Sequence, residues 1–446
     1  MRVIIAGSGE IAYQFAGEMV GRRDTVVIAE NPDEVGRFDK LDVQLIVGSP
    51  ADSEVLRALD ICDDDDFIAC SESDERNIIA CLSAKQVCGV HTICFITKEE
   101  YYRSFSPRAG REPTSFIDRI IWPQKMLAEE IARIVLVPEA IDVEILEGGR
   151  IWLQEYRIQP GSPLLEKPLH QLDLHPGLLA VAQAREQEFS VPRGDTRFEA
   201  GDKVTFMGTP RALRSLERHF FRRSVAEKVT NVAIIGGGNV GGIIANILEE
   251  EAERIRIKII ERDLARCETL AADLKSAMVL HGDGSDLELL DVEQIFLSDV
   301  LVAVTSHDEK DLLCSLLALE MEIPKVITRA TNPANVHLFE SLGISVALNP
   351  ALTAIKTVVA YLQETSARLL AVTEQGKGNV IEMTVPDEFP VTGIMDLAHI
   401  DDVIIAAIVR RRKTIVPRGR DSIKPGDRLL IFATQEATES VEQYFA

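Results

Sequence analysis

Gly7-Ser8-Gly9-Glu10-Ile11-Ala12 is a glycine-rich turn, and it returns in the second half of this 446-residue chain as Gly236-Gly237-Gly238-Asn239-Val240-Gly241. Each turn follows a short apolar strand, Val3–Ile5 or Val232–Ile235, and each opens a helical pattern. In such a turn the first glycine permits a tight bend, the second lets the backbone approach a pyrophosphate, and the third position takes a small residue. The pair therefore predicts two nucleotide-binding modules in one polypeptide.

A glutamate ends the strand that follows each turn. Glu30 lies 23 residues after Gly7, and Glu261 lies 25 residues after Gly236, close to the spacing of about 20 that is typical of dinucleotide-binding folds. The helix N-terminus offers unpaired N–H groups to phosphates, while the carboxylate binds ribose hydroxyls and repels a 2′-phosphate. A glycine turn without a ligand is the alternative for either motif alone, and two motifs in register argue against it.

These patterns give candidate nucleotide contacts in both halves of the chain. They are Gly7, Gly9, Glu10, Ile11 and Glu30 in the first half and Gly236, Gly238, Asn239, Val240, Gly241 and Glu261 in the second.

The duplication extends well beyond the glycines. Val191–Gly194 (Val-Pro-Arg-Gly) returns as Val416–Gly419, and Gly201-Asp202 returns as Gly426-Asp427, both 225 residues later. A near-constant offset is what tandem duplication of a unit of roughly 225 residues leaves behind.

Each repeat divides into two parts. Its first part alternates short apolar strands with amphipathic helices, which predicts a parallel, doubly wound α/β sheet of the Rossmann type. Its second part is small and rich in strand-like stretches, with a hairpin expected at Val191–Asp202 in the first repeat. The expected domains are two Rossmann-like domains with their crossover helices, 1–140 and 229–370, and two small α+β domains, 141–224 and 371–446.

Composition limits the partners. The formal net charge of −23 argues against nucleic acid and anionic membranes, which attract basic surfaces. No apolar run approaches the roughly 18 residues of a membrane span, and Met1-Arg2 leads directly into the first strand, so we expect a cytoplasmic protein. The seven cysteines contain no C-x-x-C pair and the eight histidines no H-x-x-x-H spacing, so no metal site is expected.

The chain resembles the tandem RCK (also called KTN) NAD-binding proteins that regulate Trk-type potassium uptake. The resemblance covers essentially the whole chain. It rests on the domain order, on His281–Asp286 after the third strand, on Ala303–Thr305 and Asp308–Asp311 around the fourth strand of the second repeat, and on Ser71–Asn77 in the first repeat. It adds Ser71, Asp283, Thr305 and Arg329 to the candidate nucleotide contacts, with Asp283 beside the adenosine half and Arg329 placed for phosphate.

The resemblance also implies a gating subunit rather than an enzyme, with no catalytic residues. Such proteins form homo-oligomers, dimers or tetrameric rings, beneath an integral-membrane Trk-type potassium channel subunit, and they bind NAD(H), ATP or ADP in their Rossmann clefts. This chain would then lie at the inner face of the cell membrane through that partner.

In this family the crossover helices, Pro123–Val135 and Pro350–Leu362 here, pair neighbouring units. The apolar stripe expected to serve that role is Ile117, Ile120, Ile121, Leu127, Ile131 and Ile134. A helix that only covers its own sheet predicts the same stripe.

The resemblance also predicts two unequal clefts. The first repeat has Ser49 where Asp283 aligns, and Thr97 where family members often carry arginine. Each loss removes a contact worth on the order of 1.5–3 kcal/mol, so we expect the second cleft to bind nucleotide more tightly.

Two alternatives remain open. An NAD-dependent oxidoreductase uses the same turn, but it needs an acid or base beside the nicotinamide, and His170, His175 and His399 stand isolated in the sequence. The second alternative is an RCK regulator of another ion transporter or exchanger, with a ligand such as a cyclic dinucleotide in the small domain.

Overall fold

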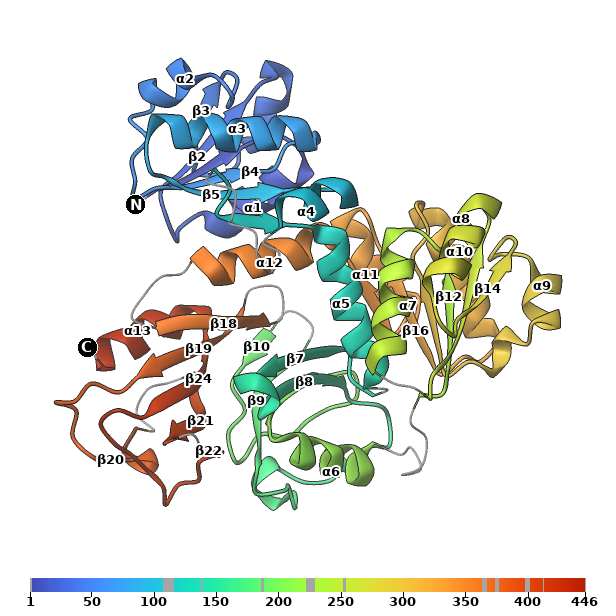
Figure 1. Ribbon diagram of the computed structural model, residues 1–446. Coiled ribbons are helices and arrows are strands. Elements are labelled where there is room, and N and C mark those ends of the chain that lie inside the picture. Colours follow the sequence, from blue (N-terminus) through green and yellow to red (C-terminus); the bar gives the residue numbers. More distant parts are fainter. Residues whose placement is uncertain are drawn as a thin grey trace. The chain divides into compact units, whose positions relative to one another are not determined.

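The computed structural model describes residues 2–106, 116–137, 139–185, 188–221, 229–251, 254–362, 367–373, 377–397, 402–411 and 413–445. The chain folds as two compact units. The first comprises Met1–Ala128, Arg329–His337 and Leu348–Leu362, and the second comprises Glu129–Thr328, Leu338–Ala347 and Gln363–Ala446. Figure 1 shows their elements along the chain.

The first unit is built on a six-stranded parallel sheet. Its strands, in spatial order, are β3 (Gln44–Val47), β2 (Thr25–Ala29), β1 (Val3–Ala6), β4 (Asp66–Ala69), β5 (His91–Phe95) and β6 (Arg119–Ile121). Strands β1, β2 and β4 are buried along their whole length and, apart from Thr25 and Asp66 at the starts of β2 and β4, are apolar. This is expected where helices cover both sides of a parallel sheet. This confirms the predicted doubly wound α/β fold.

Helices cover both faces of this sheet. They are α1 (Glu10–Met19), the 3-10 helix η1 (Pro32–Phe38), α2 (Ser53–Ala58), α3 (Asp74–Val87), α4 (Glu99–Phe105) and the first part of α5 (Pro123–Leu136).

A helix from the second repeat completes the first unit. Helix α12 (Pro350–Leu362; orange in Figure 1) packs against α1, and both belong to one buried apolar cluster on the sheet. Its contacts there are Ala354, Ile355, Val358, Val359 and Leu362. The Arg23 guanidinium donates to the Leu362 carbonyl at the end of the helix. A crossover helix therefore pairs with the other repeat's Rossmann sheet, as the resemblance implies.

The apolar stripe that we expected on the crossover helix of the first repeat is partly misplaced. Ile120 and Ile121 lie in β6, and Ile117 precedes that strand, so these three side chains belong to the core of their own sheet. Leu127, Ile131 and Ile134 do lie on α5, and all three are fully buried. The prediction was wrong for the first three because β6 was not recognised: a three-residue strand is too short to show an alternating pattern.

The second unit contains the second Rossmann sheet. Its order is β14 (Met278–His281), β13 (Arg256–Glu261), β12 (Asn231–Ile235), β15 (Val300–Ala303), β16 (Lys325–Arg329) and β17 (Val346–Leu348). The strands from β14 to β16 pair in parallel. The helices of this repeat are α7 (Asn239–Glu251), α8 (Leu264–Asp273), α9 (Leu287–Val292), α10 (Asp308–Glu320) and α11 (Pro333–Ser341).

Lys325, at the start of β16, ties the end of α5 into this unit. Its ammonium donates to the carbonyl oxygens of Ile134, Val137 and Ala140 at 2.9, 2.9 and 2.7 Å. The residue is only 4% exposed. It therefore satisfies carbonyls at and just beyond the end of α5, which a helix cannot pair internally, and its charge complements the negative end of the helix dipole.

Two small antiparallel sheets complete the second unit. One has the order β10 (Glu188–Ser190), β9 (Leu178–Arg185), β11 (Lys203–Gly208), β8 (Ile151–Arg157) and β7 (Asp142–Leu146), followed by α6 (Pro210–Phe220). The other has the order β22 (Lys413–Ile415), β21 (Val403–Arg410), β24 (Arg428–Thr434), β19 (Gly378–Thr384) and β18 (Ala367–Thr373), followed by α13 (Gln435–Phe445). The two strand orders match one for one, which confirms the duplication.

The hairpin that we expected at Val191–Asp202 is wrong. This segment contains no strand and links β10 to β11, and both of these strands pair with β9 rather than with each other. The repeated Gly-Asp pair has a different role: Asp202 accepts from Arg185 at 2.8 Å, and Asp427 accepts from Arg410 at 2.7 Å. The two aspartates hold equivalent loops against equivalent strands.

Candidate nucleotide-binding clefts

Both glycine turns leave the central strand of a parallel sheet at the point where the strand order reverses. The first turn joins β1 to α1, and the second joins β12 to α7. Open α/β sheets bind ligands at this switch point, outside the carboxyl ends of the strands. The fold therefore places both motifs where a nucleotide can bind.

The first glycine of each turn is required by the backbone. Gly7 has φ +145° and Gly236 has φ +103°. A Cβ on Gly236 would lie 2.9 Å from the Thr305 nitrogen, and a Cβ on Gly7 would lie 2.9 Å from the Ser71 nitrogen. Ser71 and Thr305 therefore occupy equivalent places against the two turns.

The second glycine is not required by the backbone in either turn, but its surroundings differ between the two clefts. Nothing lies within 4 Å of a Cβ built on Gly238, whereas a Cβ on Gly9 would meet the Glu72 side chain at 3.7 Å. Open space beside the backbone is what close approach of a pyrophosphate needs. The turn of the second cleft leaves more open space at this position than the turn of the first.

Glu261 lies at the second glycine turn, as the motif predicts. Its carboxylate accepts from the backbone nitrogen of Gly237 at 2.7 Å and from that of Asp263 at 2.8 Å. Asn239 is the exposed first residue of α7, while Val240 and Gly241 are buried beneath it. A Cβ on Gly241 would lie 2.0 Å from the Gly236 carbonyl oxygen, so these last two positions serve packing.

Arg266 was missed by sequence reasoning. It lies on α8 and donates to the carbonyl oxygens of Gly237 at 2.7 Å and Gly238 at 3.3 Å. Its guanidinium therefore lies against the turn that would hold the phosphates. The available signal was its position three residues after the N-cap Asp263, which places it in the first turn of the helix that follows β13.

Asp283 is paired within the second unit. Its carboxylate lies 2.5 Å from the Lys310 ammonium, and it accepts from the Ser285 hydroxyl at 2.7 Å. The Lys310 pair, followed by the Ser285 hydrogen bonds, holds the pKa of Asp283 well below its usual range. Arg329 is the last residue of β16, and its contact with phosphate stays a prediction.

The fourth-strand exits are built alike. The backbone nitrogen of Thr305 donates to Asp311 at 2.6 Å, and that of Ser71 donates to Asn77 at 2.8 Å. This correspondence makes Arg76 the counterpart of Lys310, one residue earlier on each helix.

Glu30 is engaged in the first cleft. Arg76 pairs with it at 2.7 Å, and the Ser49 hydroxyl donates to it at 3.0 Å. Ser49, which replaces Asp283, therefore serves Glu30 instead. Thr97 donates through both its nitrogen and its hydroxyl to the buried Asp74, at 2.8 and 2.9 Å.

The first turn is surrounded by further charges. Arg37, from η1, donates to the Ser8 carbonyl at 3.2 Å and pairs with Glu10 at 2.7 Å. The Ser8 hydroxyl donates to Glu34. Ile11 is half-buried against the core formed by α1 and α12. Arg37 thus occupies the place that Arg266 has in the second cleft, but it also pairs with the Glu10 carboxylate.

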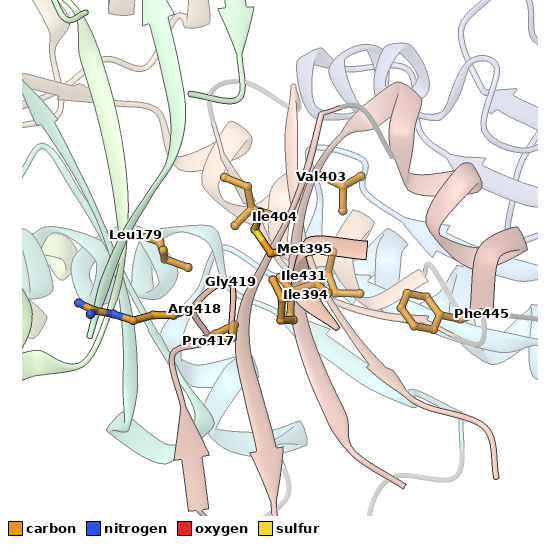
Figure 2. A pocket seen from close by; sticks show the side chains of 11 residues that line it. Leu179, Ile394, Met395, Val403, Ile404, Pro417, Arg418, Gly419, Ile431 and Phe445 are labelled. Atoms are coloured by element: carbon orange, nitrogen blue, oxygen red, sulfur yellow. The ribbon is translucent and has the colours of Figure 1, made fainter. Parts of the chain in front are cut away.

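A third candidate is a pocket of about 390 Å³ in the two small sheets, within the usual range for small-molecule sites. Figure 2 shows its apolar side chains, among them Ile404, Met395 and Ile431, with the Arg418 guanidinium directed away from them. Among the residues that the structure describes, no His, Cys, Asp, Glu, Lys or Tyr side chain lines it.

Two features are absent from the part of the chain that the structure describes. There, no helix combines the length and apolar character of a membrane span. In the same residues, no three or more His, Cys, Asp or Glu side chains gather in a way that could hold a metal ion.

Sequence comparison matches the whole length of the chain. The TrkA-N domain matches residues 3–123 and 232–350, and the TrkA-C domain matches 153–220 and 380–446. Trk system potassium uptake protein TrkA homolog 2 of Methanosarcina mazei is 33% identical over 100% of both chains, as is the TrkA homolog of Archaeoglobus fulgidus. The Haemophilus influenzae Trk system potassium uptake protein TrkA is 27% identical over 98% of this chain and 96% of its own.

Solved structures share the fold. The GsuK RCK domain has a TM-score of 0.60 at 18% identity, covering 100% of this chain and 94% of its own. The GsuK channel bound to NAD also has a TM-score of 0.60 at 18% identity, covering 99% of this chain and 78% of its own.

Proposed function

The chain belongs to the TrkA family, and from this premise we propose that it is a nucleotide-sensing regulatory subunit of a Trk-type potassium uptake system. Relatives that carry this name match it from end to end. The observation that carries the proposal is the second glycine turn, where open space at Gly238 adjoins the Glu261 carboxylate and the Arg266 guanidinium.

The ligand that fits this geometry is an adenine nucleotide with a diphosphate, either NAD(H) or ATP and ADP. The N-terminus of α7 and Arg266 supply positive charge for phosphates. Glu261 supplies an acceptor for ribose hydroxyls and disfavours a 2′-phosphate. In the second cleft Gly236, Gly238, Asn239, Glu261, Asp283, Thr305 and Arg329 would surround the ligand, and in the first cleft Gly7, Gly9, Glu10, Glu30 and Ser71 hold the equivalent places.

The proposed partner is the integral-membrane subunit of the transport system, with this chain forming a homo-oligomer, a dimer or tetrameric ring, at its cytoplasmic face. Gating then requires that the nucleotide bind one conformation of the assembly more tightly than another, since only differential affinity shifts an equilibrium.

The oxidoreductase alternative lacks support from the histidines that it would need. His170 donates to the Gly194 carbonyl at 2.8 Å, and His175 accepts from the Gly177 nitrogen at 3.1 Å. Both side chains brace loops of the first small domain. His399 lies outside the described residues. We therefore propose a regulator and not an enzyme.

Potassium flux through vesicles tests the proposal directly. The full-length chain is co-purified with a Trk-type membrane subunit, and flux is measured with and without NADH, ATP and ADP. We expect at least one nucleotide to change the flux, and Gly238→Ala to abolish that response without removing the complex. If the potassium flux is the same with and without this chain, the proposed role in potassium uptake is overturned. That result would favour a regulator of another transporter or exchanger.

A further inference from the structure

The two glycine turns differ in charge at two equivalent positions. Glu10, the first residue of α1, corresponds to Asn239, the first residue of α7. Glu72 follows Ser71, and Ser306 follows Thr305, at the equivalent strand exits. The first cleft therefore carries two carboxylates where the second carries an amide and a hydroxyl.

Glu10 lies where an anion would bind. It is the first residue of α1, its carboxylate accepts from Arg37 at 2.7 Å and from Gln14 at 2.8 Å, and its side chain is 46% exposed. A carboxylate is stabilised at a helix N-terminus for the same reason that a phosphate is. Glu10 therefore already uses the charge of α1 and of Arg37 that a pyrophosphate would need.

Glu72 approaches the same turn from the neighbouring strand. Its Oε1 atom lies 3.8 Å, and its Cγ atom 3.7 Å, from the position of a Cβ on Gly9. The side chain is exposed. A diphosphate that approached the backbone at Gly9 would meet this second negative charge at close range, where repulsion is strong.

The second turn has the opposite character. Gly238 has open space beside it, Asn239 and Ser306 carry no charge, and Arg266 donates to the turn itself. The first turn therefore carries two carboxylates, Glu10 and Glu72, beside its arginine, whereas the second turn has its arginine and no carboxylate at these two positions.

We propose that Glu10 and Glu72 are specificity-determining residues that exclude diphosphate-containing nucleotides from the first cleft. This inference rests on the proposed function, because it assumes that the second cleft binds such nucleotides. It gives Glu10 the reverse of the role expected from the motif: the residue competes with the ligand instead of contacting it.

Calorimetric titration of NADH into the full-length protein, with EDTA present so that no divalent cation bridges the charges, tests the inference. The wild-type chain is expected to bind one equivalent tightly. Glu10→Gln combined with Glu72→Gln keeps the side-chain size and removes both charges. This double variant is expected to strengthen the weak site by about tenfold or more, which corresponds to at least about 1.4 kcal/mol, and to bring the stoichiometry toward two.

The reciprocal change is made in the second cleft. Asn239→Glu combined with Ser306→Glu is expected to weaken the tight site by about tenfold or more. A charge-matched control is Glu18→Gln combined with Asp24→Asn, since these residues lie at the far end of α1 and before β2, away from the turn. The control is expected to leave both affinities unchanged, and circular dichroism confirms that each variant is folded.

Salt separates repulsion from a structural effect. Raising ionic strength from about 0.1 to 1 M shortens the screening length from roughly 10 to 3 Å. The weak site of the wild-type chain should gain affinity, and the site of the Glu10→Gln, Glu72→Gln variant should lose it.

Three outcomes overturn the inference. Two equal tight sites in the wild-type chain would do so while leaving the proposed function intact. So would a double glutamine variant that is folded but gains no affinity. A wild-type chain that binds neither NADH nor ADP removes both the inference and the proposed function.

Discussion

The two Rossmann domains share a backbone and differ in what surrounds it. Gly7 and Gly236 make the same bend against the same strand exit, and the strand orders are identical. The charges around them are not: Glu30 is paired with Arg76 in the first cleft, while Glu261 caps the turn itself in the second. After the duplication both turns kept a glycine at the first position, because a side chain there would clash with the next strand exit. The charged residues around the turns are under no such steric requirement, and they diverged.

A second difference lies at the amino end of the fifth strand of each sheet. The fifth strand begins with His91 in the first repeat and with Lys325 in the second. His91 accepts or donates a 2.9 Å hydrogen bond with the Tyr361 hydroxyl of α12, and Lys325 donates to three carbonyls at the end of α5. Each strand thus holds the crossover helix of the other repeat, through one side-chain hydrogen bond in the first case and through three hydrogen bonds from an ammonium in the second.

The largest expected effect is on the contact between Lys325 and the end of α5. Lys325→Met removes the donor from three buried carbonyls, and we expect it to lower the free energy of unfolding by about 2–4 kcal/mol. His91→Leu replaces an imidazole that is 28% exposed, and we expect it to lower the free energy of unfolding by about 1 kcal/mol or less. Urea denaturation followed by circular dichroism measures both, and equal losses would contradict the distinction.

The next effect concerns the second glycine of each turn. Gly238→Ala fills the open space that the ligand needs, and we expect NADH affinity at the tight site to fall by about tenfold or more with little change in melting temperature. Gly9→Ala meets only ordinary contacts with Glu72 and should leave the tight site unaltered. An unchanged affinity in Gly238→Ala would place the tight site elsewhere.

Glu261→Gln and Glu30→Gln compare the two ribose carboxylates. Loss of charge at Glu261 weakens a hydrogen bond to ribose, and we expect NADH affinity to fall by several-fold, up to about tenfold. Glu30 lies in the first cleft, where it is already paired with Arg76 at 2.7 Å, so its replacement should leave the tight site as it is. Equilibrium dialysis with labelled NADH measures both, and the reverse ranking would assign the tight site to the first cleft.

The smallest effect is pH-dependent and specific to the first domain. Burial raises the pKa of Asp65, but hydrogen bonds from Arg2 outweigh it and lower the pKa from 3.8 to about 2. Because the folded-state pKa is depressed, the stabilisation is fully present above about pH 3.8 and is lost as pH falls toward 2. Asp65→Asn should therefore cost about 1 kcal/mol at pH 6 and less at pH 3.

Thermal unfolding at the two pH values measures this loss. Asp299→Asn is the matched variant in the second domain, where the carboxylate accepts from the backbone of Thr230 and Asn231 and has no arginine counterpart to Arg2. A cost of Asp65→Asn that is as large at pH 3 as at pH 6 would contradict the role of the Arg2 pair.

Local patterns predicted the local features. The glycine turns, the strands that precede them and the helix Pro350–Leu362 were all visible in the sequence, because each depends on residues a few positions apart. Strands β6 and β17, three residues each, were not, because they are too short for a periodicity. The resemblance implied only that the crossover helices pair neighbouring units. That α12 packs on α1 required the folded chain, since an apolar stripe does not say which sheet it covers.

In the candidate site, too, features set by nearby residues were predictable and features set by tertiary packing were not. Glu30 and Glu261 could be predicted because they follow a turn at fixed spacing. Arg37, Arg266 and Arg76 could not, because a guanidinium spans several ångströms and its partner is decided by tertiary packing. The sequence predicted that Ser49 stands where Asp283 aligns, but the hydrogen bond of Ser49 to Glu30 required the folded chain.

The packing of α12 on α1 has a consequence for synthesis on the ribosome. Arg23 and its acceptor Leu362 are 339 residues apart in sequence, so at about 5–20 residues per second roughly 17–70 seconds separate them. During that interval Phe15 and Met19 on the nascent first domain have no α12 to cover them. A chaperone that binds exposed apolar surface would have its longest opportunity there, and ribosome profiling of chaperone-bound nascent chains should show that engagement end soon after residue 362 emerges.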